Sequence, residues 1–156
     1  MEKDIYCEYK NKYNENKDKD FNKDKIKVFQ IFSSGGKVII GNRSYPITYG
    51  GLYFINVNEN YSIFPENEND YFQNVCMMSG MLLDDLARLL NFEKVTNDIF
   101  KNNGGYYLPL QHYKIVDSRF KEIFGIYNAN NHYSKGLLIS KLMDIFNYVV
   151  MTSLDK

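Results

Sequence analysis

The sequence has few of the residues on which several classes of protein depend. It contains no Trp, two Cys, two His and three Pro among 156 residues. The widely separated Cys7 and Cys76 form neither a disulfide framework nor a metal-binding knuckle. Because 19 Lys and Arg balance 19 Asp and Glu, the chain lacks the basic footprint of a stand-alone nucleic-acid binder.

Long apolar segments are missing as well. No run approaches the roughly 18 residues that a membrane span needs. The first residues, Met1 to Ile5, lack the basic and then apolar order of a secretory signal. Hydrophobic residues nevertheless make up 44% of the chain and aromatic residues 16%, which excludes wholesale disorder. We therefore expect one folded domain in the cytoplasm.

The N-terminal residues 1–25 differ from the rest of the chain. The stretch from Lys10 to Lys25 is rich in Asn, Lys and Asp, and its large apolar side chains are Tyr13 and Phe21. Such a segment buries too little surface to offset the entropy that ordering costs. We predict a mobile arm over residues 1–25, whose apolar start around Ile5 could dock as an edge strand.

Residues 26–78 alternate between short β-prone runs and turn residues. The run Ile26 to Phe32 stops at two Ser and two Gly, and Leu52 to Val57 is followed by Asn-Glu-Asn. Regularly spaced short strands predict an antiparallel sandwich or small barrel. The Gly-Gly-Lys that ends at Lys37 is a turn rather than a phosphate loop, because Val38 stands where Ser or Thr is needed and a strand follows.

Residues 79–156 show the apolar spacing of about three helices, over Leu82 to Leu90, over Tyr113 to Tyr127 and from Ser134 onward. Strands followed by helices indicate an α+β fold. The third helix carries a wider apolar stripe than one packing partner needs, and the surplus can bury against the sheet or against a second copy. We predict a homodimer with these interface residues: Leu138, Leu142, Ile145, Phe146 and Val149.

No pattern of residues in the sequence indicates catalysis or metal binding. His112 and His132 lie apart, without neighbouring ligands. The adjacent Asp84 and Asp85 diverge by about 100° on a helix, so they cannot share one substrate atom. We therefore predict no catalytic residue, no metal, no cofactor and no enzymatic activity.

Several motifs occur in an unusual order within residues 26–78. The segment Phe32-Ser33-Ser34-Gly35 matches a strand ending in Ser-Gly, Arg43-Ser44-Tyr45 matches a Gly-Lys-x-Tyr hairpin, and Gly50-Gly51-Leu52 matches a Pro-Gly-Asp-Leu turn. Together they resemble the cupin-type sensor domain of AraC-family transcription regulators. Tyr61 stands where this family commonly has His, and tyrosine is a poor replacement for a neutral imidazole ligand. The resemblance thus favours a barrel without metal.

The resemblance implies an antiparallel, cupin-like β-barrel of the jelly-roll type followed by about three helices. The parts would be an arm over 1–25, a sensor barrel over 26–78 and a helical dimerisation and linker region over 79–156. The barrel would bind a small effector, for example a sugar. DNA would be bound only through a C-terminal helix-turn-helix part beyond this chain. The implied ligand-binding residues are Tyr61, Ile63, Gln73 and Val75.

Two alternatives stay open on the sequence alone. A cupin-fold enzyme with an atypical site would need a bound metal or an organised acid/base pair. A ligandless oligomerisation barrel would have an interior filled by Phe and Ile side chains. The effector, the target genes, the direction of regulation and the completeness of the chain also stay open.

Overall fold

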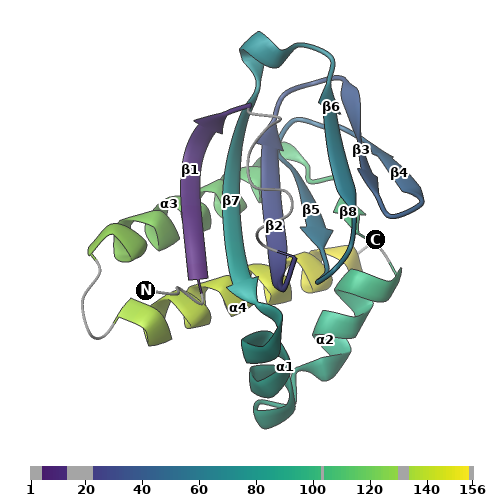
Figure 1. The fold of residues 1–156 in the computed structure, drawn as a ribbon. Helices are drawn as coiled ribbons and strands as arrows, with labels where there is room; N and C mark the ends of the chain where they lie inside the picture. Colours follow the sequence, from purple (N-terminus) through teal and green to yellow (C-terminus); the bar gives the residue numbers. More distant parts are fainter. Residues whose placement is uncertain (1–4, 14–22, 103, 130–133, 155–156) are drawn as a thin grey trace.

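The computed structural model describes residues 5–13, 23–102, 104–129 and 134–154. Two antiparallel sheets lie face to face, and the long helices α3 (Leu110–Ala129) and α4 (Ser134–Leu154) cover the opposite face of the larger sheet (Figure 1). The predicted class is confirmed: the fold is α+β, with antiparallel β-structure followed by helices.

The larger sheet has five strands in the spatial order β1-β7-β2-β5-β8. All eight residues of the central strand β2 are buried, as expected for a strand covered on both faces. The bounds of the strands are β1 (Ile5–Lys12), β7 (Phe72–Ser79), β2 (Lys25–Phe32), β5 (Gly51–Ile55) and β8 (Gly105–Tyr106).

The smaller sheet has the order β4-β3-β6, with β4 (Arg43–Pro46), β3 (Gly36–Ile40) and β6 (Tyr61–Pro65). The turn before β3 requires glycine. Gly36 has φ +100°, and a Cβ there would lie 2.2 Å from the carbonyl oxygen of Phe64. The predicted turn at this position is confirmed, since a strand and not a helix follows it.

Among the described residues, the helical part holds the three predicted helices and one short additional helix. α1 (Gly80–Leu89) begins where the Ser79 hydroxyl accepts a hydrogen bond from the backbone N–H of Leu82. A short α2 (Glu93–Asn97) and one π-helical turn, Asp98–Asn102, then lead to β8. The additional helix is α2, which is too short for apolar periodicity to reveal it.

Side chains of a strand alternate between its two faces, so the strands of the larger sheet contribute side chains to two separate cores. The helix-side core lies between this sheet and the helices, and it includes Val28, Phe54 and Cys76. The inter-sheet core lies between the two sheets and consists of nine buried residues with partly buried neighbours. The nine are Phe29, Ile31, Val38, Ile40, Ile47, Tyr53, Ile55, Tyr71 and Val75.

Part of the predicted mobile arm is an ordered strand. Ile5–Lys12 forms β1, which pairs antiparallel with β7 along one edge of the larger sheet. For this segment the structure has the alternative that the sequence left open, an edge strand docked through its apolar start, because Ile5 and Cys7 bury in the helix-side core. Residues 14–22, the centre of the predicted arm, lie outside the described residues.

The five predicted interface residues of α4 lie inside a single chain. Leu138 is 5% exposed, and the other four are at most 1% exposed. All five belong to the helix-side core, where the ring centroid of Phe146 lies 5.4 Å from that of Phe54. The surplus apolar width of this helix is therefore taken up by the sheet, and these side chains are core rather than an exposed interface. Homodimerisation itself stays a prediction.

Candidate functional site

The four residues predicted to bind a ligand lie together on the inter-sheet core. Val75 is buried in it, and Tyr61 and Ile63 pack against it from β6. Gln73 lies two residues before Val75 on β7, hence on the same face of that strand, and is 9% exposed. The structure thus brings all four to the space between the sheets, while their role in binding stays a prediction.

Hydroxyl and amide groups occur within this apolar region. The fully buried Tyr71 donates a hydrogen bond of 2.6 Å from its hydroxyl to Oε1 of Gln73. Burial, and secondarily the nearby Tyr13, Tyr53 and Tyr61, raises the pKa of Tyr71. Its phenol therefore stays protonated and acts as a hydrogen-bond donor.

A lysine also belongs to the inward face of β2. Lys27 lies on the same face of β2 as Phe29 and Ile31, and it is 2% exposed. Its Nζ donates to the carbonyl oxygen of Lys25 at 3.3 Å and lies 5.7 Å from the centroid of the Tyr61 ring. Burial lowers the pKa of Lys27, against the opposing effect of the Asp24 charge.

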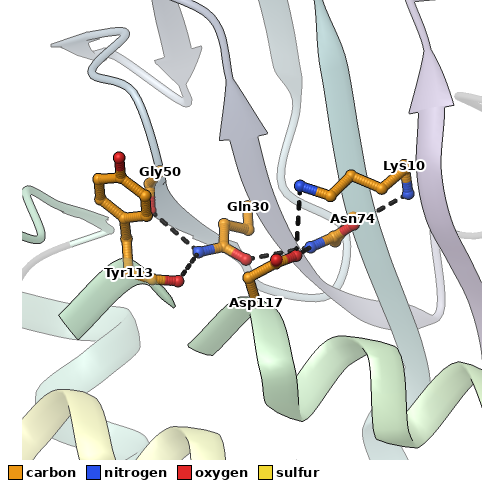
Figure 2. A network of polar contacts seen from close by, with 6 residues as sticks. All are labelled: Lys10, Gln30, Gly50, Asn74, Tyr113 and Asp117. Carbon is orange, nitrogen blue, oxygen red and sulfur yellow. Dashed lines mark hydrogen bonds and ion pairs between the residues drawn. The ribbon is translucent and has the colours of Figure 1, made fainter. Parts of the chain in front are cut away.

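A second polar group lies on the helix side of the larger sheet (Figure 2). The amide of Asn74 on β7 donates to Oε1 of Gln30 at 3.0 Å and to Oδ1 of Asp117 on α3 at 2.9 Å. Its Oδ1 accepts from the backbone N–H of Lys10 at 2.9 Å, and Lys10 Nζ lies 3.3 Å from Asp117 Oδ1. Both Asn74 and Gln30 are fully buried, so this network fixes β1, β2, β7 and α3 relative to one another.

The position of Lys10 depends on an irregularity in β1. The register with β7 shifts between Glu8 and Asn11, and Lys10 has φ +54°. Such a bulge redirects side chains, and here both Lys10 and its neighbour Tyr9 reach Asp117. Burial and this carboxylate raise the pKa of Tyr9 to about 12.

Within the described part of the chain, no group of three or more His, Cys, Asp or Glu side chains could hold a metal ion. His112 Nδ1 lies 2.6 Å from the hydroxyl of Tyr148, which ties α3 to α4, and His132 lies outside the described residues. Asp85 pairs with Arg88 on the exposed face of α1. Among the described helices, none is long and apolar enough to cross a membrane.

Neither a family model nor a curated protein matches this chain. Among solved structures, ToxT from Vibrio cholerae is 14% identical, with a TM-score of 0.45 over 95% of this chain and 55% of ToxT. ToxT bound to (E)-4-(8-methylnaphthalen-1-yl)but-3-enoic acid is 16% identical, with a TM-score of 0.48 over 96% of this chain and 56% of ToxT. The cupin domain of Cnp3 from Schizosaccharomyces pombe is 14% identical, with a TM-score of 0.34 over 40% of this chain and 45% of that domain.

The chain resembles an AraC-family regulator and cupin domains. These are the two kinds of protein that the motifs in residues 26–78 resemble. The chain spans about half the length of ToxT. At TM-scores below 0.5, no residue role passes from these proteins to this chain, so the site is described from its own contacts.

Sequence reasoning missed the polar residues that accompany the predicted site. The signal for Lys27 was present, because this lysine shares the strand parity of Phe29 and Ile31 inside an apolar run. No comparable signal existed for Tyr71, which is one of 14 tyrosines. Its burial depends on a fold that brings residues from both sheets together.

Proposed function

We propose that the chain is the effector-binding domain of an AraC-type transcription regulator. Its inter-sheet core would receive one small molecule, without a metal and without catalysis. The observation that carries the proposal is the buried Lys27 beside an apolar region that also holds the Tyr71–Gln73 hydrogen bond. A few fixed polar groups within an apolar lining are typical of small-molecule sites.

The chemistry of this region favours an apolar monocarboxylate over the sugar expected from the sequence. A carboxylate would pair with Lys27 through charge-assisted hydrogen bonds, and an apolar body would pack against side chains such as Phe29 and Ile63. A sugar would need several polar partners for its hydroxyl groups, whereas most residues of the inter-sheet core are apolar. The acid bound to ToxT belongs to this class of compound and is a ready probe.

Regulation would follow from a difference in affinity between two arrangements of the protein, because a ligand shifts an equilibrium only by that difference. Homodimerisation, contact with DNA through a separate helix-turn-helix part and a cytoplasmic location belong to the same proposal. Two buried free thiols are compatible with a reducing compartment.

The first experiment compares ligands that differ in one property. Straight-chain monocarboxylates of increasing length, the primary alcohols of equal length and a pentose are titrated by calorimetry and by thermal unfolding. An acid of suitable length should stabilise the chain by about 2.7 kcal/mol at 100 times its dissociation constant. The matching alcohol should bind at least about ten times more weakly, because it lacks the charge-assisted bond. Tighter binding of the pentose than of every acid would overturn the assignment of ligand class.

The second experiment replaces Lys27 with Met, which keeps the length of the side chain and removes its charge. Affinity for the acid should fall about 10- to 100-fold, as expected for the loss of a hydrogen bond to a charged group. The free energy of unfolding should change by about 1 kcal/mol or less, because removal of the desolvated charge offsets loss of the hydrogen bond to the Lys25 carbonyl oxygen. Lys37→Met is the matched control, since Lys37 is exposed on β3, and it should change neither quantity. Full retention of acid affinity in K27M would contradict the role of Lys27.

The same residue sets a pH dependence. Because burial lowers the pKa of Lys27, affinity for the acid should decline as pH rises through that lowered value, where the amine becomes neutral. Without ligand, the destabilisation by the charged amine is complete below the lowered pKa and fades between it and the ordinary lysine pKa. Acid affinity that is flat over this range would mean that the carboxylate lies elsewhere.

A ligandless oligomerisation domain is the second candidate. The observation that favours it is the dense lining of the inter-sheet core by large side chains, including Phe29, Ile31 and Tyr53. The ligand titration separates the two: this candidate expects no stabilisation by any of the acids, alcohols or sugars.

A further inference from the structure

The two cysteines of the chain lie opposite each other in the larger sheet. Cys7 on β1 and Cys76 on β7 are register partners, and their Sγ atoms are 3.6 Å apart. The full sequence contains no other cysteine. Thus the fold places both thiols of the 156-residue chain in contact with each other, between the edge strand β1 and its neighbour β7.

The local geometry suits a covalent bond between these residues. Directly opposed residues of an antiparallel pair have Cα atoms about 4.5–5.5 Å apart, which lies within the range of about 4.4–6.8 Å found for disulfides. Bond formation requires the sulfur atoms to approach each other by about 1.5 Å. Small side-chain rotations can supply this movement without a change in strand register.

Access to the thiols depends on β1. Cys7 is 3% exposed and Cys76 is 1% exposed, so neither sulfur meets a solute while β1 is paired. Among the described strands, the edge strand β1 pairs only with β7, and the Lys10–Asp117 and Lys10–Asn74 contacts add to its attachment. Edge segments open at lower free energy than the whole domain unfolds, and such opening exposes Cys7.

We propose that Cys7 and Cys76 are a redox pair that a hydroperoxide converts into an intramolecular disulfide, which locks β1 onto β7. This property goes beyond ligand binding in the inter-sheet core, since both sulfurs lie in the helix-side core. A crosslink between two segments so far apart in the chain removes much entropy from the unfolded state. The disulfide form is therefore the more stable form and keeps the edge strand paired.

The reaction balances with one hydroperoxide per disulfide. The Cys7 sulfur attacks the peroxide, forming an S–O bond and breaking the O–O bond, and water leaves when the peroxide is hydrogen peroxide. The Cys76 sulfur then attacks the Cys7 sulfenic acid, so that an S–S bond forms, the S–O bond breaks and a second water leaves with the remaining protons. Two electrons pass from the two thiols to the peroxide.

The roles of the two thiols follow from the strands that carry them. While β1 is paired, the Cys76 thiol donates to the Cys7 sulfur, and burial together with this bond raises the pKa of Cys76. Opening of β1 ends this contact and exposes Cys7, so Cys7 is the first to react, and Cys76 attacks when β1 pairs again with β7.

The test exposes the full chain to hydrogen peroxide under native conditions. We expect a product without covalent crosslinks between chains, in which each chain is two mass units lighter, has no alkylatable thiol and is restored by dithiothreitol. Its midpoint of thermal unfolding should rise by about 5–15 °C. The single variants C7A and C76A should show no such rise. Overoxidised thiols, crosslinked dimers or unreacted thiols in the wild-type chain would each overturn the proposal, and this reading does not depend on the folding of either variant.

A second measurement tests the access route. Asp117→Asn removes the charge that holds Lys10 and should speed disulfide formation several-fold, because β1 then opens more often. Asp144→Asn is the matched control, because Arg119 Nε and Asp144 Oδ2 are likewise 3.3 Å apart but join α3 to α4 instead of to β1. Equal rates in D117N, D144N and the wild-type chain would overturn gating by β1.

Discussion

Replacement of Phe146 with Ala is expected to lower the free energy of unfolding by about 3–5 kcal/mol. Phe146 is fully buried at the centre of the helix-side core, with ring centroids 5.4 Å from Phe54 and 6.1 Å from Phe100. Truncation removes both edge-to-face contacts and leaves a cavity among α4, β5 and the π-helical turn. For a domain of ordinary stability, this loss is a large part of the total free energy of unfolding.

Urea unfolding of F146A and the wild-type chain, followed by circular dichroism, measures this loss. Met151→Ala is the control on the same helix, because Met151 is 66% exposed and its loss should change stability by less than about 0.5 kcal/mol. If Phe146 instead formed a dimer interface, F146A would yield a folded monomer of unchanged stability at low concentration. That result would contradict its assignment to the core.

Replacement of Asn74 with Leu is expected to cost about 3 kcal/mol. Leu has a similar size but removes the hydrogen-bond partner of Gln30 Oε1 and of the Lys10 backbone N–H, and it takes one of two partners from Asp117 Oδ1, which keeps Lys10 Nζ. A buried polar group that loses its partner costs more than the hydrogen bond contributed, because it is not returned to water. The loss should also weaken the pairing of β1.

Denaturant unfolding again gives the free energy, and hydrogen exchange at the amides of β1 reports on the local effect. Asn147→Leu is the matched control, since Asn147 is exposed on α4 and its replacement should be nearly neutral. A loss below about 1 kcal/mol in N74L would mean that the network contributes little to holding α3 against the sheet.

The sequence predicted local structure well where local chemistry decides it. The glycine turn before Val38 and the helices around Phe120 and Phe146 follow from residue types and periodicity alone. Alternation placed Tyr61 with Ile63 and Gln73 with Val75 on one face of their strands, while the family resemblance, and not alternation, pointed to these faces as a site.

What could not be predicted depends on contacts between distant segments. The apolar width of α4 was equally compatible with a partner chain and with the sheet, and only the folded structure shows that Val28 and Phe54 cover it. The pairing of β1 with β7 joins the N-terminal segment to the last strand of the barrel sequence. Periodicity indicates which residues of a segment are buried but not which segment buries them.

Within the candidate site, sequence reasoning located the apolar wall and Gln73 but not the charged and phenolic groups. Lys27 was assigned to a strand without regard to which face it occupies. Asn74 and Asp117 are too far apart in sequence to suggest a network. Buried polar groups are satisfied by partners that the three-dimensional fold supplies, so their roles appear only once those partners are known.

Both edge strands of the five-stranded sheet lie outside residues 26–78, the segment that forms its inner strands. One flank is β1, and the other is the two-residue β8, in which Tyr106 pairs with Leu52. A fragment limited to residues 26–78 would expose unpaired backbone N–H and C=O groups along both edges of this sheet. Exposed sheet edges promote aggregation with other copies. Anyone dividing this molecule for biochemical work therefore needs to retain Ile5 through Tyr106 as one piece to keep the sheet capped at its two rims.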